Sequence, residues 1–381
     1  MAGYQVLLGG KPAPKEFYPD IARLEVEENA DLPDAICLEL TVAAQGGELT
    51  WVGDKRVGPY ASIAVVITPD GADPQCVFDG YVLGHKVRVP AGPTGATVEV
   101  YGQDTGVLMG LTETVREWSG KTDSQVAAEV FDRHHVTPAP ANNLQTAPAH
   151  TEQGHTLMQR ASDLDFLRWL ARRTGRWFRV YCAGTAGQRI GYFAPPDLDA
   201  HPVITIDLND RTRSSTPVLE FSWDVVRPTK VAARQASLSD SDQDGVGADT
   251  ADAGLRALAD RSLAAFAGRD RTLILTTAAD TNELPQRAAG VLREAAWFAR
   301  CEGTTDLAAL GRVLRVGDVV EVAGCGTLLS GKYLVWSVRH QLTAESDAMS
   351  FVLARNAVGP GQGTSAGGLA STVAGALGGA L

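Results

Sequence analysis

An acidic run in the C-terminal half of the chain has the residue types best suited to binding a metal ion. Residues 240–245 read DSDQDG, which reproduces the first half of a calcium loop, in which alternate carboxylates surround the ion and glycine permits the tight turn. The second half departs from that pattern, because Ala251 occupies the twelfth position, where the loop needs a bidentate glutamate. We interpret residues 240–252 as a solvated acidic loop and predict no metal-binding residue.

The histidines are the next candidates for catalysis or metal binding. His134 and His135 are adjacent, and His150 and His155 are five residues apart. Neither pair has the four-residue spacing with a helical glutamate that zinc hydrolases use. His134 and His135 fall near the end of a predicted helix, where a partial positive charge suits the helix dipole. We therefore predict structural roles for these histidines.

Motifs that bind phosphates are absent from the sequence, which contains no P-loop and no Gly-rich dinucleotide turn after a strand. It has no GxSxG between a strand and a helix either, because its one match, residues 363–367 (GTSAG), falls in the Gly/Ala-rich tail. Asp163 and Asp165 could suggest the paired carboxylates of a glycosidase, but side chains two apart on a helix do not face each other, and both suit a helix start. We predict no catalytic residue, no cofactor-binding residue, no cofactor and no enzymatic activity.

A well-capped helix positions those two aspartates at residues 162–175. Ser162 is a typical N-cap, Arg172 and Arg173 lie in the last turn, and Gly175 ends the helix. Its broad apolar face consists of Leu164, Phe166, Leu167, Trp169 and Leu170. A helix with such a face is framework, packed against a core.

Composition excludes several function classes. The 381 residues include 34 Lys plus Arg and 45 Asp plus Glu, a net charge of -11, so a sequence-independent nucleic-acid binder, which needs a basic face, is not expected. The cysteines are odd in number and widely scattered, which indicates neither a metal knuckle nor a disulfide framework; they are Cys37, Cys76, Cys182, Cys301 and Cys325. The start lacks a signal-like segment and no apolar run could span a membrane, so we expect synthesis and folding in the cytoplasm.

The order of elements predicts mainly β structure at both ends. Short alternating runs separated by Gly, Pro and Asp predict a barrel or sandwich in the first hundred residues; the runs are residues 22–27, 36–42, 61–68, 77–83, 86–89 and 97–101. A capping box at Thr122 and Gln125 begins a helix, and residues 176–181 form a strand. Strands are expected again at 203–208, 218–223, 230–233 and within 313–353, with helices at 255–268 and 283–298.

A short internal echo suggests two related β units. Phe78-Asp79-Gly80 followed by Val87-Arg88 has the spacing of Leu329-Ser330-Gly331 followed by Val338-Arg339. An alternating strand follows each copy, at residues 97–101 and 350–354. The match rests on few residues, but it agrees with the strands expected at both ends of the chain.

Read in order, several segments resemble the late control protein D family of phage tails and the hub portion of VgrG proteins from type VI secretion and related contractile injection systems. The most specific segment is residues 160–175, a polar turn, an acidic cap and a Phe-Leu helix. Others are residues 100–104 (VYGQD), 120–122 (GKT), 331–333 (GKY), 338–340 (VRH) and 351–357 (FVLARNA). The resemblance spans roughly residues 4–359.

The resemblance implies an α+β, mainly β fold with two similar β-barrels and α+β elements inserted. We expect a first barrel at residues 1–113, an α+β insert at 114–200, a second barrel at 201–358 with a helical insertion at about 240–300, and a flexible Gly/Ala-rich tail at 359–381. It further implies a structural hub: a homotrimeric ring of six barrels that adapts a sixfold tail tube to a threefold spike.

The resemblance also implies the partners and location of the protein. These are the tail tube, baseplate proteins and a spike, which we expect to be a separate polypeptide because the chain ends where VgrG proteins continue into a needle. Assembly into a phage tail or contractile injection particle follows synthesis in the bacterial cytoplasm, without nucleic-acid specificity or membrane insertion. The alternatives are a peptidoglycan-degrading tail enzyme, which would need a deep cleft with convergent acids, and a receptor- or glycan-binding tip protein, which would need an exposed aromatic patch.

Overall fold

The structure is a computed structural model that describes residues 3–45, 48–91, 95–143, 149–150, 156–209, 218–235, 247–277, 283–343 and 347–361. The acidic motif at residues 240–245, His155 and most of the predicted tail lie outside these ranges. The helices that the structure describes include none that is long and apolar enough to cross a membrane.

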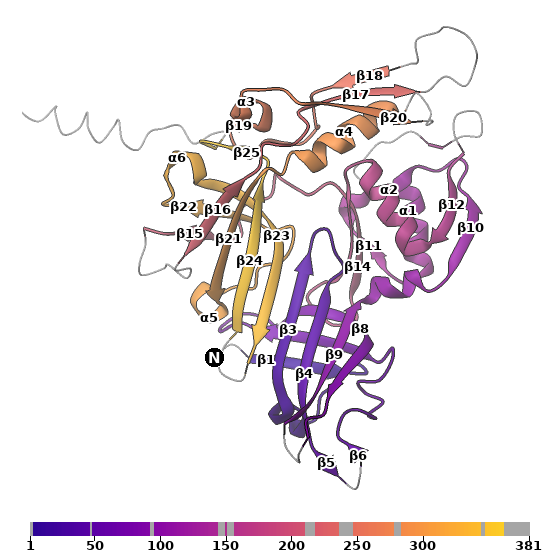
Figure 1. Cartoon of the computed structure of the whole chain (residues 1–381), viewed down its shortest axis with the longest axis vertical. Coiled ribbons are helices and arrows are strands. Elements are labelled where there is room, and N and C mark those ends of the chain that lie inside the picture. Colours follow the sequence, from indigo (N-terminus) through magenta and orange to yellow (C-terminus); the bar gives the residue numbers. More distant parts are fainter. Residues whose placement is uncertain are drawn as a thin grey trace, which may run out of the picture.

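The fold is mainly β, as predicted, and one large sheet runs through the molecule (Figure 1). Thirteen strands of the described ranges pair in the order β16-β21-β24-β23-β3-β4-β9-β8-β7-β1-β2, and β22 links β15 to β23. The N-terminal strands are β1 (Gly3–Leu8), β2 (Lys11–Pro12), β3 (Ile21–Asn29), β4 (Ala35–Val42), β7 (Ser62–Thr68), β8 (Gln75–Arg88) and β9 (Ala96–Asp104). The C-terminal strands are β15 (Thr205–Asp207), β16 (Leu219–Trp223), β21 (Ala299–Asp306), β22 (Val319–Ala323), β23 (Gly331–Leu342) and β24 (Asp347–Arg355).

The two halves of this sheet repeat one topology. In the first half the spatial order is β3-β4-β9-β8-β7-β1, and in the second it is β16-β21-β24-β23-β22-β15. When the six strands of each half are numbered in chain order, the two halves have the same spatial order of strands. They differ in one pairing, since β15 runs parallel to β22 whereas β1 runs antiparallel to β7. The internal echo therefore falls on equivalent hairpins, β8–β9 and β23–β24. Each hairpin has a bulge, which lies just after Val82 in one and after Val335 in the other.

Strand β23 joins the two halves. Its first four residues, Gly331–Leu334, pair with β22, and the stretch from Ser337 to Leu342 pairs with β3 in antiparallel register. Each half also has its own apolar core. One gathers Leu24, Val26, Leu38 and Val65, and the other gathers Val320, Val335, Phe351 and Leu353. The predicted domain limits at residues 113, 200 and 358 stay a prediction.

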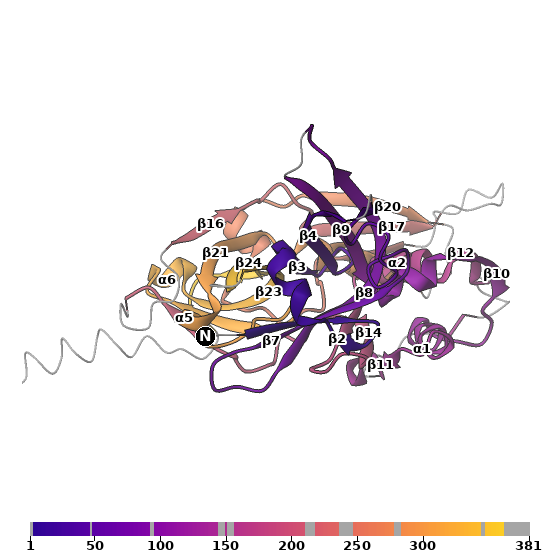
Figure 2. The same cartoon turned by 90° about the horizontal axis from the view of Figure 1, so that it is seen from below.

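The insert follows the first half and combines two helices with two small sheets, β10-β12 and β11-β14-β13 (Figure 1 and Figure 2). Helix α1 (Asp123–Arg133) begins with the predicted capping box, in which Thr122 and Gln125 bond each other's backbone amides. Helix α2 (Asp163–Arg173) begins at Ser162, whose hydroxyl accepts the amide of Asp165. The strands are β10 (Glu113–Glu117), β11 (Thr137–Pro138), β12 (Met158–Ser162), β13 (Trp177–Cys182) and β14 (Arg189–Ala194). Capping residues close in sequence made both helices predictable.

Another small sheet lies beside helix α4 (Leu284–Ala295), at the top of Figure 1. It pairs β18 (Gly247–Thr250), β17 (Lys230–Gln235) and β20 (Thr272–Thr277). Gly290 in α4 lies against the end of α2, since a Cβ added there would come within 2.9 Å of Gly175 N and 2.8 Å of Thr174 C. The insert and the second half therefore meet at close backbone contact.

The predicted helix at residues 255–268 is wrong over most of its length. Only its last turn, α3 (Leu263–Ala267), is helical, beginning at Ser262 and ending at Gly268. The preceding backbone bonds to the C-terminal segment instead: Leu258 N donates to Asn356 Oδ1 at 2.9 Å, and β19 (Arg261–Ser262) pairs with β25 (Ala357–Val358). A partner about a hundred residues away thus replaced the local helical bonds.

Several short elements complete the chain. Strands β20, β21, β10 and β12 were not predicted, because each depends on pairing with a distant strand. The remaining elements are β5 (Ala44–Gln45), β6 (Glu48–Leu49), the 3-10 helices η1 (Lys15–Asp20), η2 (Thr105–Gly110) and η3 (Pro140–Asn143), and the helices α5 (Leu307–Leu310) and α6 (Gly326–Leu329).

Candidate functional site

One face of the large sheet is polar and open to solvent. Along β3, Leu24 and Val26 are buried while Glu25 and Glu27 point to the opposite side, as the two-residue period of a strand requires. Arg339 on β23 and Glu302 on β21 extend this polar face into the second half. Two shallow hollows of about 490 and 430 Å³ lie on it.

Ion pairs cross this face from strand to strand. Arg23 lies 3.4 Å from Glu39 and 3.6 Å from Glu99, and Lys86 lies 3.3 Å from Glu99. Across the β3–β23 joint, Arg339 lies 2.6 Å from Glu27. Because these pairs are exposed, each contributes little to stability. Where two strands are paired, each acidic side chain in these pairs has a basic side chain on a nearby strand, so their charges are balanced.

In the part of the chain that the structure describes, each end of the eight-strand path from β16 to β8 has an unpaired edge carrying apolar side chains. The second half of β8 pairs only with β9 within the described residues, and Val87 and Val89 on and just after it are 39% and 62% exposed. At the other end, Trp223 of β16 is 57% exposed. On the equivalent part of β23, where β3 is paired, Val338 and Leu342 are fully buried. The two edges therefore lack the cover that the internal joint has.

The charges at these two edges are complementary. Glu220 on β16 stands directly opposite Glu302 on β21, and like charges in that position are unfavourable unless a cation lies nearby. Lys86 lies on the same polar side of β8 and is largely exposed. The internal joint has the same arrangement, with Glu27 on β3 and Arg339 on β23.

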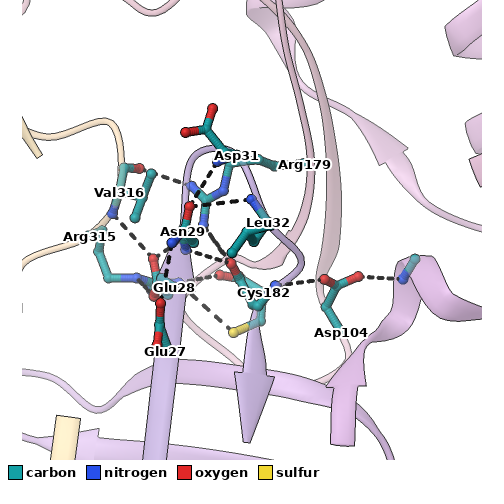
Figure 3. Close-up of polar contacts among 12 residues, drawn as sticks. Glu27, Glu28, Asn29, Asp31, Leu32, Asp104, Arg179, Cys182, Arg315 and Val316 are labelled. Atoms are coloured by element: carbon teal, nitrogen blue, oxygen red, sulfur yellow. Dashed lines mark hydrogen bonds and ion pairs between the residues drawn. The ribbon is translucent and has the colours of Figure 1, made fainter. Parts of the chain in front are cut away.

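A buried ion cluster ties the insert to both halves (Figure 3). Arg179 of β13 lies 3.1 Å from Asp34 and 3.5 Å from Glu28, and it donates to the Val316 carbonyl at 3.1 Å. Arg315 pairs with the other oxygen of Glu28 and donates to the carbonyls of Cys76 and Cys182 at 2.9 and 3.0 Å. All three parts of the chain therefore meet at two arginines.

The acids of this cluster are the strongest candidates for a catalytic pair, because their pKa values are perturbed. Burial raises the pKa of Asp104 and of Asp34, and the charge of Asp34 raises that of Asp104 further. Yet Asp104 accepts the amides of Asp34 and Gly106, and the adjoining hollow, about 30 Å³, is too small for a sugar. The geometry fits structural carboxylates.

A second buried cluster contains His150. Its Nε2 lies 2.7 Å from Asp123 Oδ1 and its Nδ1 lies 2.9 Å from Glu283 Oε1. Arg173 of α2 lies 2.5 Å from the same glutamate. Burial alone would lower the pKa of His150, but the two carboxylates outweigh it and raise that pKa to about 9. The cluster links the starts of α1 and α4.

Stability should depend on the charge of His150. Because its folded pKa lies above the ordinary value, its stabilisation is complete below about pH 6.5 and is lost as pH rises through 9. Between pH 7 and 9 the free energy of unfolding should fall by about 2 kcal/mol more in the native protein than in His150→Gln. Urea titrations at both pH values measure this, with exposed His201→Gln as control. An equal pH dependence in all three proteins would contradict the role of His150.

The other predicted residues have structural surroundings. His134 lies 2.8 Å from Asp163, which Arg133 also contacts at 2.9 Å, while Asp165 is exposed and bonds the Ser162 hydroxyl. His135 has a left-handed backbone just after α1. The five cysteines are free thiols. The described residues contain no group of three or more acidic, histidine or cysteine side chains placed to hold a metal ion.

Sequence comparison decides the family. The profile of the Alg8 N-terminal domain matches residues 22–344. The chain belongs to the Alg8 N-terminal domain family. No curated protein sequence matches it significantly.

Solved structures with the same fold come from phage tails and secretion systems. The 43 kDa tail protein of prophage MuSo2 from Shewanella oneidensis has a TM-score of 0.63 at 15% identity, covering 93% of this chain and 99% of that one. A tail protein from Neisseria meningitidis MC58 has a TM-score of 0.62 at 14% identity, over 93% and 97%. An Escherichia coli type VI secretion component similar to T4 gp27 and gp5 has a TM-score of 0.56 at 14% identity, over 92% and 76%. At these identities the likeness is one of fold.

Proposed function

We propose that this protein is a structural component of a phage-tail-like contractile machine: the hub, a homotrimeric ring that adapts a sixfold tail tube to a threefold spike. The observation that carries the proposal is the repeated strand topology with its internal joint. The fold shared with solved tail proteins supports it, as does the resemblance to late control protein D and VgrG hubs.

We take the pairing of β3 with β23 inside the chain as the model for strand pairing between two copies of the protein. Strand β16 is the topological equivalent of β3, and β8 is the equivalent of β23. If β16 of one copy pairs with the open half of β8 in the next, the joint inside the chain repeats between chains. The contact is head-to-tail, and such contacts close into rings when the rotation allows.

This contact would satisfy the unpaired edges described above. Edge strands with exposed apolar side chains readily pair with another chain, and here Val87 and Trp223 would become covered. Lys86 of the next copy would also approach Glu220, which faces Glu302. Two topological units per chain make three copies a ring of six units, which matches the symmetry of a sixfold tube while keeping a true threefold axis.

A charge exchange tests the ring. Glu220→Lys is expected to raise the concentration at which trimers form by at least tenfold, because Lys86 then meets a like charge. Combining it with Lys86→Glu should restore assembly, whereas Glu113→Lys on exposed β10 should have no effect. Mass photometry and analytical ultracentrifugation measure the species, with and without the spike protein. A protein that stays monomeric in both conditions, or trimers that no substitution changes, would refute the proposed ring.

The remaining partners are the tail tube, the spike and the baseplate proteins, all structural. The fully hydrogen-bonded state of Asp104 and the small hollow beside it favour this role over peptidoglycan cleavage. Incubation of the protein with purified peptidoglycan is accordingly expected to release no soluble fragments.

A further inference from the structure

We infer that a cleft between the insert and the second half binds an acidic peptide segment of a partner protein. The cleft has a volume of about 430 Å³, which is within the range of ligand sites. It lies where the end of α2, the end of α4 and β23 meet. The inference is independent of the proposed ring, because one copy of the chain contains the whole cleft.

The cleft has more basic than acidic side chains in a protein of negative net charge. Its lining within the described ranges includes six arginines but only two acids, Asp31 and Glu294. Three of the arginines, Arg168, Arg176 and Arg227, pair with Asp165, Asp123 and Asp224, which are not in the lining. Asp31 already accepts the indole NH of Trp336 at 2.9 Å. A positive excess in one hollow of a chain with a net charge of -11 concentrates attraction for an anion there.

Three of these arginines form no ion pair within the described chain, and two of the three are held in place by other contacts. Arg293 donates to the carbonyls of Ala253 and Thr174 at 2.8 and 2.9 Å, which fixes its guanidinium. Arg300 lies 5.5 Å from the centre of the Trp336 ring, and Arg172 is exposed at the end of α2. No carboxylate of the described chain lies within ion-pair distance of Arg172, Arg293 or Arg300. Guanidinium groups fixed in this way are suited to binding carboxylates with paired hydrogen bonds.

The floor of the cleft favours a peptide over a nucleic acid. Trp336 packs against two other tryptophans. Its ring centre lies 5.3 Å from that of Trp177, edge to face, and 5.4 Å from that of Trp297, tilted. Trp177, Trp297 and Trp336 are 9%, 3% and 7% exposed, so they offer apolar edges instead of open ring faces on which bases could stack. An aliphatic or aromatic side chain next to a carboxylate fits this combination of apolar floor and cationic rim.

Binding can be measured with a defined probe. A fluorescein-labelled octapeptide of alternating Asp and Leu is titrated with the full chain in 50 mM NaCl and followed by fluorescence anisotropy. We expect saturable binding that Arg172→Glu and Arg300→Gln each weaken at least tenfold. Arg160→Glu, an exposed arginine on β12 outside the cleft, should leave the affinity unchanged. Circular dichroism melts confirm that each variant is folded, and the exposed Arg172 provides a test should Arg300→Gln unfold.

Three results would overturn the inference. One is no binding of the Asp-Leu peptide up to 1 mM. Another is binding that the two cleft variants leave unchanged, which would place the peptide elsewhere. The third is tighter binding of a thymidine octanucleotide than of the peptide, lost in the same variants, which would make the cleft a nucleic-acid site. A Lys-Leu peptide serves as the charge control and should not bind.

Discussion

Replacing Arg179 by methionine is expected to lower the free energy of unfolding by about 3 to 5 kcal/mol. The guanidinium is buried among Asp34, Glu28 and the Val316 carbonyl, and methionine fills similar space without the charge. Two buried acids would then lose a cation, and an uncompensated buried charge is among the most destabilising changes. Urea unfolding followed by tryptophan fluorescence measures the loss.

Two further variants separate the effect of losing the Arg179 charge on stability from the effect of changing the side-chain volume. Adding Asp34→Asn to Arg179→Met should restore part of the lost stability, because one uncompensated carboxylate is removed. Arg160→Met, at an exposed position of β12, should change stability by less than about 0.5 kcal/mol. A loss below 1 kcal/mol in Arg179→Met would mean that the ion cluster does not hold the three parts of the chain together.

Shortening Leu167 to alanine is expected to cost about 2 to 5 kcal/mol and to lower the soluble yield. Leu167 is fully buried in the core of the insert, with Phe166 and Leu170 from the same helix. Removing its branched end leaves a cavity that close-packed neighbours cannot fill completely. The same urea titration applies, with Arg172→Ala, at an exposed position of the same helix, as the matched control. A normally folded variant of unchanged stability would place α2 outside the structural framework.

The helices of the insert could be predicted because their determinants are local. Thr122 with Gln125, and Ser162 with Gly175, mark helix ends within a few residues of the bonds that they make. Residues 255–262 carried an equally good apolar pattern, but Asn356 supplies the bonding partner instead. Helix propensity depends on residues within a turn or so of each other, so it takes no account of a hydrogen-bonding partner a hundred residues away.

The candidate site was predictable only in outline. The echo around Gly80 and Gly331 identified the equivalent hairpins, although their bulged residues lie three and five positions after those glycines. The β3–β23 joint depends on pairs about 300 residues apart, such as Glu27 with Arg339, and the arginine cleft depends on distant contacts such as that of Arg293 with Thr174. The sequence around His150 did not indicate its two acidic partners, because Asp123 lies well before it and Glu283 well after it in the chain.

The divided pairing of β23 has a mechanical consequence. One strand bonds β22 with its first part and β3 with its last part, so the two halves cannot slide along each other without breaking the whole β3–β23 ladder at once. Load applied along the strands meets these hydrogen bonds in shear, whereas load across the sheet would open them one after another. In the contractile particle that we propose, the tip is driven along a single axis. The fold offers its greatest resistance to rupture when that axis follows β3 and β23.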